Sequence, residues 1–231
     1  MDRLKKDAPG GARTSGRATA RNTSAQRERT REAILAAAFA LIGHAEGRAV
    51  RIEEICSRAA ISRGSFYNYF AGMEALFAAL AIDLTHAFTL AVLDEMGRMD
   101  GAAEQTDAAL RYYLERAVDD PAWAWAMVNI GATGPLFGAE THASALATVE
   151  AGIAAGEFKL PSARLGRAVI LGACHAAIVD LLRDGVGEVL PSDVSRAVLR
   201  ALGIAESDID RIVARRLPPP RRQAGGVSTP G

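Results

Sequence analysis

Residues 51–70, with the sequence RIEEICSRAAISRGSFYNYF, constrain the fold most, because they predict two short helices joined by a tight turn. The first helix has one apolar face, at intervals of three and four residues, formed by Ile52, Ile55, Cys56 and Ala59. Ser62 is a suitable N-cap for the second helix, because its hydroxyl can accept a hydrogen bond from a free amide of the next turn. Phe66 and Phe70 share a face that can pack on the first helix. The pattern predicts a helix–turn–helix, whose second helix enters the major groove of DNA while the first crosses the backbone.

The remaining side chains of the second helix suit contact with DNA. Gly64 and Ser65 are poor residues for a helix interior, yet their small size lets a helix approach phosphates and base edges closely. Tyr67 and Tyr69 carry phenolic hydroxyls that can bind phosphate. The alternative is an ordinary helical hairpin whose polar face is only hydrated.

The segment from Thr30 to Leu80 resembles the N-terminal DNA-binding domain of the TetR family of bacterial transcriptional repressors. The resemblance covers TREAILAAAFALIGHAEG, the helix–turn–helix, and the start of a following helix, MEALFAAL. Its most specific part is ISRGSFYNYF followed by MEALF, and the rest of the chain fits the family in length and helical pattern. The resemblance implies an all-α protein, in which a three-helix helix–turn–helix DNA-binding domain joins a larger helical ligand-binding and dimerisation domain.

The resemblance also implies which residues contact DNA. It puts the first residues of the second helix near base edges, the residues at its end on bases or phosphates, and Arg51 against the DNA backbone. The DNA-binding set is then Arg51, Ser62, Arg63, Gly64, Ser65, Tyr67, Asn68 and Tyr69.

Three positions depart from the family pattern. Ala60 stands where the turn usually has glycine, and a left-handed backbone costs a residue with a side chain about 1 kcal/mol. Arg51 replaces the usual Thr or Ser at the start of its helix, which removes a cap but adds a charge. Met73 replaces a lysine that often contacts phosphate, which puts that contact in doubt.

The charge of the chain is unevenly distributed. Overall 27 basic residues balance 27 acidic ones, but residues 1–70 hold 13 Lys and Arg against 7 Asp and Glu, a net charge of +6. Most of this excess lies in residues 1–31. A basic arm ahead of a helix–turn–helix can reach along the DNA backbone or into a minor groove and add salt-sensitive affinity. A solvated flexible tail that happens to be basic is the alternative.

Composition limits the fold class, the location and the cofactors that we expect for this protein. Alternating Val/Ile/Thr-rich runs are missing, so β-sheets are not expected. The first 25 residues lack the apolar segment of a secretory signal, and charged residues and a histidine interrupt the most apolar stretch, residues 165–182. We therefore expect a cytoplasmic protein that does not interact with the membrane. Cys56 and Cys174 lie far apart and fit no disulfide framework or zinc site, so no metal and no cofactor are expected.

The chain divides into four parts by pattern: a disordered basic arm (1–22), the DNA-binding domain (27–87), an effector-binding and dimerisation domain (88–217) and a disordered tail (218–231). The Thr-x-x-Gln pattern at Thr23 predicts a capping box that opens the first helix. Later helices are expected over 73–96, 106–118, from Pro121 after an Asp120 N-cap, 142–155, 162–183, 192–202 and 207–217.

The resemblance implies a homodimer on a palindromic site and an unidentified small-molecule effector held among the helices of the second domain. The helices that begin at Ser162 and Ser192 are the candidates for dimerisation, because small residues along the first allow close helix approach; the alternative is that they only close the core of the monomer. For the effector pocket we expect an aromatic lining near the tryptophans, formed by Tyr113, Trp123, Trp125 and His142, although each of these residues can equally belong to the core.

Two other classes of function compete with a regulator. An enzyme is disfavoured, because no spacing resembles a nucleophile elbow, a metal pair or a phosphate loop. A helical protein–protein adaptor with only non-specific DNA affinity would keep the fold, but it leaves the basic arm and the ISRGSFYNYF face without a role. The expected function is a DNA-binding repressor released from its operator by an effector.

Overall fold

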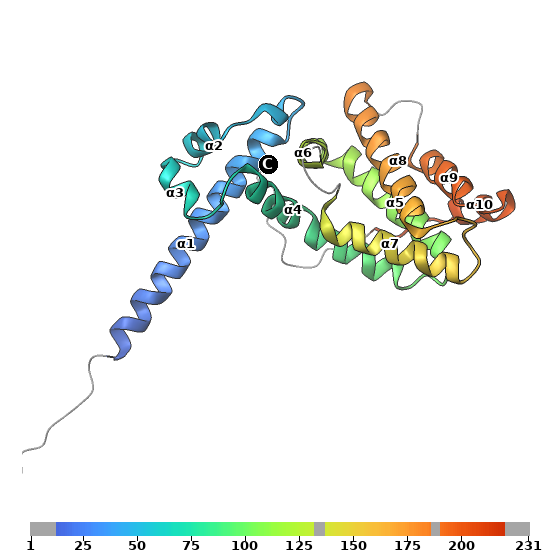
Figure 1. Cartoon of the computed structure of the whole chain (residues 1–231), viewed down its shortest axis with the longest axis horizontal. Helices are drawn as coiled ribbons and strands as arrows, with labels where there is room; N and C mark the ends of the chain where they lie inside the picture. Colours follow the sequence, from blue (N-terminus) through green and yellow to red (C-terminus); the bar gives the residue numbers. More distant parts are fainter. Residues whose placement is uncertain (1–12, 132–136, 186–189, 220–231) are drawn as a thin grey trace, which may run out of the picture.

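The computed structural model describes residues 13–131, 137–185 and 190–219, and every regular element within these residues is a helix (Figure 1). The N-terminal part, here called the head, comprises α1 (Arg13–Ile42), the short 3-10 helix η1 (Gly47–Ala49), α2 (Ile52–Arg58), α3 (Arg63–Tyr67) and the start of α4 (Met73–Met96). The remainder, here called the body, comprises α5 (Ala102–Asp119), α6 (Pro121–Gly131), α7 (Gly138–Ala154), α8 (Ala163–Asp184), α9 (Pro191–Ala201) and α10 (Glu206–Val213). The expected all-α class is confirmed.

Helix α4 connects the two parts, leading from α3 into the body (Figure 1). Leu76 and Leu80, near its start, are fully or almost fully buried with the head residues Ile34, Ile55 and Phe66. Further along, Val92 and Met96 pack with Tyr112 of α5 in a second apolar cluster. A change in the direction of α4 therefore moves the head relative to the body.

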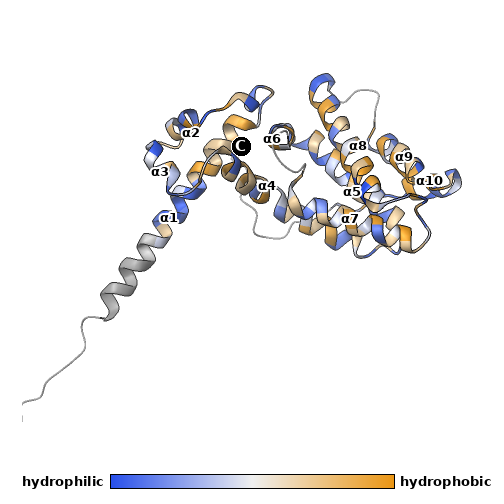
Figure 2. Cartoon of the chain, viewed as in Figure 1, coloured by the Kyte–Doolittle hydropathy of each residue, from blue (hydrophilic) through white to orange (hydrophobic). Residues whose placement is uncertain are grey.

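Two helices, α4 and α8, are long and apolar enough to cross a membrane by length and composition. Packing within the protein accounts for their apolar character, because α4 is shared by the cores of head and body, and α8 packs on α5, α6, α7 and α9. The body helices carry both hydrophobic and hydrophilic residues (Figure 2). Only one side of α8 is buried, and Leu165 stays 45% exposed.

The predicted start of α1 is wrong. The helix begins at Arg13, so Thr23 lies within it and does not cap it, and α1 includes residues 13–22 of the predicted arm. These residues include Ala and Arg, good helix formers, and no proline, so the helix continues through them. Residues 1–12 of the predicted arm and 220–231 of the predicted tail lie outside the described residues.

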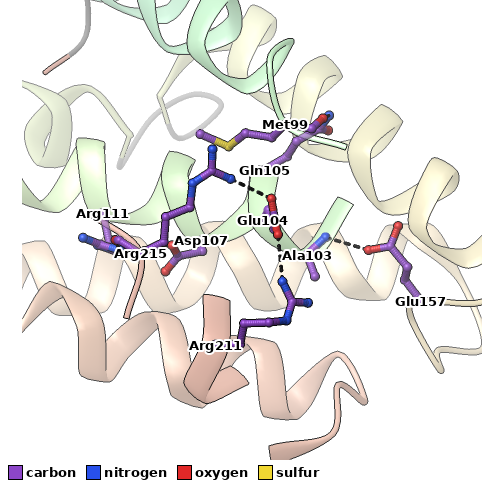
Figure 3. Close-up of polar contacts among 9 residues, drawn as sticks. All are labelled: Met99, Ala103, Glu104, Gln105, Asp107, Arg111, Glu157, Arg211 and Arg215. Atoms are coloured by element: carbon purple, nitrogen blue, oxygen red, sulfur yellow. Dashed lines mark hydrogen bonds and ion pairs between the residues drawn. The ribbon is translucent and has the colours of Figure 1, made fainter. Parts of the chain in front are cut away.

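Helix α5 begins four residues before the predicted Thr106, at Ala102. The Glu157 carboxylate accepts hydrogen bonds from the amides of Ala102 and Ala103, at 3.1 and 3.0 Å, and so caps the helix from a distant part of the chain (Figure 3). Local sequence does not reveal such a cap, which is why the start was misplaced.

Three later boundaries also moved. Helix α9 begins at Pro191 and not after a Ser192 cap, because Asp193 accepts a hydrogen bond from the Leu190 amide and Pro191 takes the first position. Helix α7 begins at Gly138, four residues before the expected start, and α10 ends at Val213, four residues before the expected end. The predicted N-caps Asp120 and Ser162 are confirmed by hydrogen bonds to the amides of Trp123 and Leu165.

Polar contacts along α5 hold the C-terminal helices on the body. Glu104 lies between Arg211 and Arg215, with N–O distances of 3.0 and 2.7 Å (Figure 3). Ser195 of α9, fully buried, donates its hydroxyl to Asp107 at 2.7 Å. Burial raises the pKa of Asp107, while Ser195 and Arg111 oppose that rise. These contacts hold α9 and α10 against α5.

Candidate DNA interface and effector cavity

Local contacts between α2 and α3 fix the recognition helix. The Ser62 hydroxyl accepts from the Ser65 amide at 3.0 Å, which confirms the predicted N-cap of α3. Ala60, in the turn, has φ of 53°, so a residue with a side chain occupies the left-handed region, as the missing glycine predicted. Phe66 and Phe70 are buried, 0% and 5% exposed, and anchor the helix to the head.

The opposite face of α3 is open. Arg63, Gly64, Tyr67 and Asn68 are exposed, while Ser65 and Tyr69 are half-buried. Gly64 has no close neighbour, since a Cβ there would meet only the Ser62 hydroxyl, at 3.8 Å. Nothing in the free protein therefore requires glycine at this position, and a close approach to DNA supplies a reason for it.

Ser62 and Arg51, two of the predicted DNA-binding residues beside this face, differ in their surroundings. Ser62 and Ser65 pair their hydroxyls at 3.0 Å within the cap, so both are engaged before any DNA arrives. Arg51 precedes α2, with its amide donating to Glu54 at 2.8 Å and its side chain 78% exposed. The guanidinium of Arg51 also pairs with Glu54 at 3.8 Å, but it is exposed enough to reach a phosphate beside α2.

Sequence reasoning missed the residues that position this face. Glu53 pairs with the predicted base-reading residue Arg63 at 2.8 Å. A hydrogen bond with Tyr67 and the charge of Glu53 raise the pKa of Arg63, so its guanidinium stays charged. From α1, the guanidinium groups of Arg27 and Arg31 lie 5.8 and 5.9 Å from the ring centres of Tyr69 and Phe70. Their spacing of four residues on a helix was the available signal.

The body contains a small cavity of about 40 Å³ between α4, α5, α7 and α8. Its lining residues are Thr89, Val92, Leu93, Met96, Thr106, Ala109, Tyr113, Thr141, Ser144, Ala145, Thr148 and Ile170. Hydroxyl and aliphatic groups line it, and no Asp, Glu, Lys, Arg or His side chain does. This volume is far below that of a typical small-molecule site, so side chains would have to move to admit a ligand.

Of the four expected pocket residues, only Tyr113 lines this cavity. Trp123 is 1% exposed and packs its ring against Tyr113 and Phe88, while its indole N–H donates to the Leu84 carbonyl at 3.1 Å. Trp125 is half-buried on α6 and does not line the cavity. His142 lies on α7 beside Thr141, and burial and the charge of Arg167 lower its pKa. The cavity is therefore lined by threonine, serine and aliphatic side chains, with a single aromatic ring.

Helix α6 links the neighbourhood of the cavity to the head. Its Asn129, 4% exposed, donates from the side-chain amide to the carbonyls of Ile42 and His44, each at 2.8 Å. These carbonyls belong to the last residue of α1 and to the turn that follows. The Ala122 carbonyl approaches Gly43 so closely that a Cβ there would lie 3.0 Å away. Both ends of α6 thus hold the C-terminus of α1.

Within the described residues, no group of three or more His, Cys, Asp and Glu side chains could hold a metal ion. Burial raises the pKa of Cys174 to about 12, and it also raises the pKa of Cys56. Both thiols therefore stay protonated at neutral pH and are poor nucleophiles.

Two family models match the chain. Residues 34–80 match the bacterial regulatory proteins of the tetR family, and residues 101–215 match the tetracyclin repressor-like C-terminal domain. The chain belongs to the TetR family. It is thus a helix–turn–helix, DNA-binding transcriptional regulator, and the TetR-type matches agree with the positions of head and body.

Solved structures of TetR-type regulators share this fold. A crystal structure of RolR in complex with resorcinol is 25% identical, with a TM-score of 0.68, and the match covers 86% of this chain and all of RolR. RolR without ligand is 26% identical, with a TM-score of 0.65, over 80% of this chain and 96% of RolR. FadR from Bacillus subtilis, in complex with stearoyl-CoA, shares the fold at 18% identity and a TM-score of 0.57, over 74% of this chain and 96% of FadR. No curated protein matches the sequence.

Proposed function

We propose that this TetR-family regulator is a homodimeric repressor, which binds a palindromic operator through α3 and leaves it when a small molecule fills the cavity of the body. The observation that carries the proposal is the open face of α3, where Arg63 and Tyr67 are exposed on a helix whose other face is fully anchored. A protein–protein adaptor would have no need of a charged arginine beside a glycine and a tyrosine on so short a helix.

The DNA contacts in this proposal follow from side-chain chemistry. Arg63 can make two hydrogen bonds to a guanine edge, and Asn68 can do the same with adenine. Tyr67, Tyr69, Ser62 and Arg51 would bind phosphates, and Gly64 and Ser65 would leave room for the close approach. We assign residues 27–87 to DNA binding and residues 88–217 to effector binding and dimerisation, with α4 continuous across the boundary.

The dimer in this proposal forms through α8. One face of this helix exposes small and apolar residues at intervals of three and four, namely Leu165, Ala168, Gly172 and Ala176, with the half-buried Val169 and Val179 beside them. A Cβ at Gly172 would meet no atom within 4 Å, so the middle of this face is open. Packing it on the same face of a second copy would form half of a four-helix bundle, with α9 beside it.

Release by an effector follows from the contacts of Tyr113. This ring lines the cavity and lies 6.1 Å from the ring of Trp123, centre to centre. Trp123 lies in the first turn of α6, whose Asn129 holds the last carbonyl of α1 and that of His44 just after it. A molecule that displaces Tyr113 would therefore shift α6 and, through it, the head. RolR with resorcinol and FadR with stearoyl-CoA support a role for this body in binding small molecules of different sizes.

The proposal includes no catalytic step, and it places the protein in the cytoplasm, where the chromosome of a bacterium lies. Its test is the selection of binding sites from random double-stranded DNA, at about 0.15 M salt with an inert competitor, because phosphate contacts alone are strongly salt-dependent. Enrichment of a palindrome supports sequence-specific binding by a dimer. Retention without any motif would reduce the protein to a non-specific DNA binder and would contradict the proposal.

A further inference from the structure

Helix α1 extends well beyond the part that packs in the head. The helix begins at Arg13, but among its described side chains, from Ser24 onward, the first buried one is that of Ile34. The residues from Ser24 to Arg29 are all exposed. Figure 1 shows this end of α1 leaving the head beside α3, on the side away from the body. Helix α1 is therefore longer than the packing of the head requires.

The sequence of this end of α1 does not suit an apolar partner. Residues 13–33 contain no Leu, Ile, Val, Met, Phe, Tyr or Trp. A helix that packs on another protein or lies on a membrane needs a stripe of large apolar side chains. Residues 13–31, here called the basic segment, hold six arginines and one glutamate, a net charge of +5. The partner that fits this composition is a polyanion.

The spacing of the arginines also favours such a partner. Arg13, Arg17 and Arg21 recur every four residues. Positions four apart share one face of a helix, where like charges repel and lower the stability of the helix. The single glutamate, Glu28, pairs with Arg31 at 4.0 Å, and it cannot balance six arginines. Phosphates bound along the helix would remove this repulsion.

The inner end of the basic segment adjoins the recognition helix. The guanidinium of Arg27 lies 5.8 Å from the ring centre of Tyr69, and that of Arg31 lies 5.9 Å from the ring centre of Phe70. Both rings belong to residues that come just after α3. Arg27 is exposed, so α1 carries positive charge next to the end of α3. A duplex bound by α3 therefore has the basic segment beside it.

The length of the basic segment sets how far this contact reaches. Arg13 lies 14 positions before Arg27 on one continuous helix, which corresponds to about 21 Å at about 1.5 Å per residue. One base pair of B-DNA rises about 3.4 Å, so this length equals about six base pairs. Because the segment leads away from α3, the phosphates within its reach flank the half-site.

We propose that the basic segment of α1 binds, as a helix, the DNA phosphates that flank each half-site. This contact reads no bases, since phosphates carry no sequence information, and it lengthens the footprint of each head by about six base pairs. The inference rests on the proposed function, because it enlarges the DNA interface of α3. It gives a role in affinity to arginines that lie outside the helix–turn–helix.

The test compares the binding of two duplexes to the full-length protein. One duplex ends at the outer edges of the selected palindrome, and the other continues on each side for about six base pairs of unrelated sequence. Fluorescence anisotropy gives both affinities over a range of about 0.05 to 0.2 M salt. We expect the longer duplex to bind at least about 10-fold more tightly at about 0.15 M salt, whatever its flanking sequence. Equal affinity for the two duplexes would overturn the inference.

A double variant then removes charge from the basic segment alone. Arg17→Gln with Arg21→Gln replaces two arginines by another good helix former. A dimer would lose four phosphate contacts, so the slope of log K against log salt should become shallower by about 3.6. Lys159→Gln with Arg216→Gln is the matched control, because both residues are exposed in the body. A change of the same size in both double variants would contradict the role of the basic segment.

Ala20→Pro tests whether the segment binds as a helix. Proline removes a helix hydrogen bond and clashes with the preceding turn, so it interrupts α1 between Arg17 and Arg27. The head should stay folded, because the buried side chains described for α1 begin at Ile34. A helical contact predicts that the longer duplex loses its advantage in this variant. An unchanged advantage would show that the segment binds without being helical, against the inference.

The same titrations separate this inference from the proposed function. If the protein binds the short palindromic duplex and the added flanks change nothing, the role of the basic segment is wrong and the proposed function stands. If neither duplex binds more tightly than random DNA, the proposed function fails. Tighter binding of the longer duplex, reduced in the Arg17 and Arg21 variant but not in the control, supports both.

Discussion

The recognition face of α3 and the cavity of the body differ in how the chain assembles them. The polar residues of α3 fall within seven consecutive positions, Ser62 to Asn68, and most of them are exposed. The hydroxyls of the cavity come from three helices, from Thr89 of α4 to Thr148 of α7, and they meet only because the body packs. The residues for DNA recognition are thus neighbours in the sequence, whereas the residues that line the cavity are brought together only by the tertiary structure.

The two regions also differ in charge, and this difference fits their ligands. The exposed guanidinium of Arg63 is charged and pairs with Glu53, so it can bind phosphates and base edges. The polar groups that line the cavity are only hydroxyls and the neutral phenol of Tyr113. Helix α6 contacts the end of α1 in the head through Asn129 and the cavity residue Tyr113 through Trp123, so a single substitution in α6 can test the link between the two regions.

The largest expected effect tests whether both heads must act together. Gly172→Arg should leave the monomer folded, because a Cβ at this position meets no atom within 4 Å, but it places a charge in the proposed dimer interface. Losing the second half-site should weaken operator binding by about 100-fold or more. Light scattering and DNA titration measure the two effects. Ala214→Arg, on the exposed end of α10, should remain dimeric; a dimeric Gly172→Arg variant would refute the α8 interface.

Arg63→Ala tests direct reading of a base by α3. It should cost about 2 kcal/mol of binding to the selected operator and relax the preference at one position of each half-site. Competition titrations against singly substituted operators measure this loss. Arg58→Ala, at the exposed end of α2, is the control and should not change base preference. An equal loss on every sequence would make Arg63 a phosphate contact.

Asn129→Leu tests the link between the two regions. The substitution keeps the approximate volume of the side chain but leaves the carbonyls of Ile42 and His44 without their donor, which should lower the free energy of unfolding by about 1.5 kcal/mol. It should also reduce the fraction of operator that a saturating effector releases. Chemical denaturation and fluorescence anisotropy check the two results; full release by the effector would show that coupling bypasses Asn129.

Tyr67→Phe removes one hydroxyl from the recognition face. If this group binds phosphate, affinity should fall by about 1 kcal/mol on all DNA sequences alike. Tyr112→Phe is the control, because the Tyr112 hydroxyl donates to Pro218 in the body. Unchanged affinity of Tyr67→Phe would remove this residue from the DNA-binding set.

The smallest effect concerns the turn before α3. Ala60→Gly relieves the left-handed backbone, although glycine loses more freedom on folding, so the net gain in stability should be about 0.5 kcal/mol. DNA affinity should not change, because Ala60 is outside the recognition face. Thermal unfolding detects the gain, and a loss of stability would mean that the Ala60 methyl makes packing contacts that outweigh the strain.

The head could be predicted from the sequence in most details, since caps, apolar spacing and the missing turn glycine are local signals. Ser62, Ala60 and the bounds of α4 follow from them. The body could not be predicted in the same detail, because the first residues of its helices and the lining of its cavity depend on residues that are distant in the sequence. Glu157 caps α5 from 54 and 55 residues away, and the cavity is lined by threonines that no sequence pattern marks.

The aromatic residues show the same limit. Trp123 looked like a pocket residue because aromatic residues are scarce in this chain, yet it is buried among Phe88 and Tyr113 beside the cavity. A sequence pattern identifies which side chains are apolar. Only packing decides which of them are left facing empty space.

The most direct test of the central claim compares two DNA duplexes. One holds the selected palindrome and the other has one half-site scrambled, and the dissociation constants of both are measured by fluorescence anisotropy at about 0.15 M salt. Sequence-specific recognition by two linked heads predicts that the intact palindrome binds at least about 100-fold more tightly. Equal affinity for both duplexes would contradict the claim that two copies of α3 read the operator together.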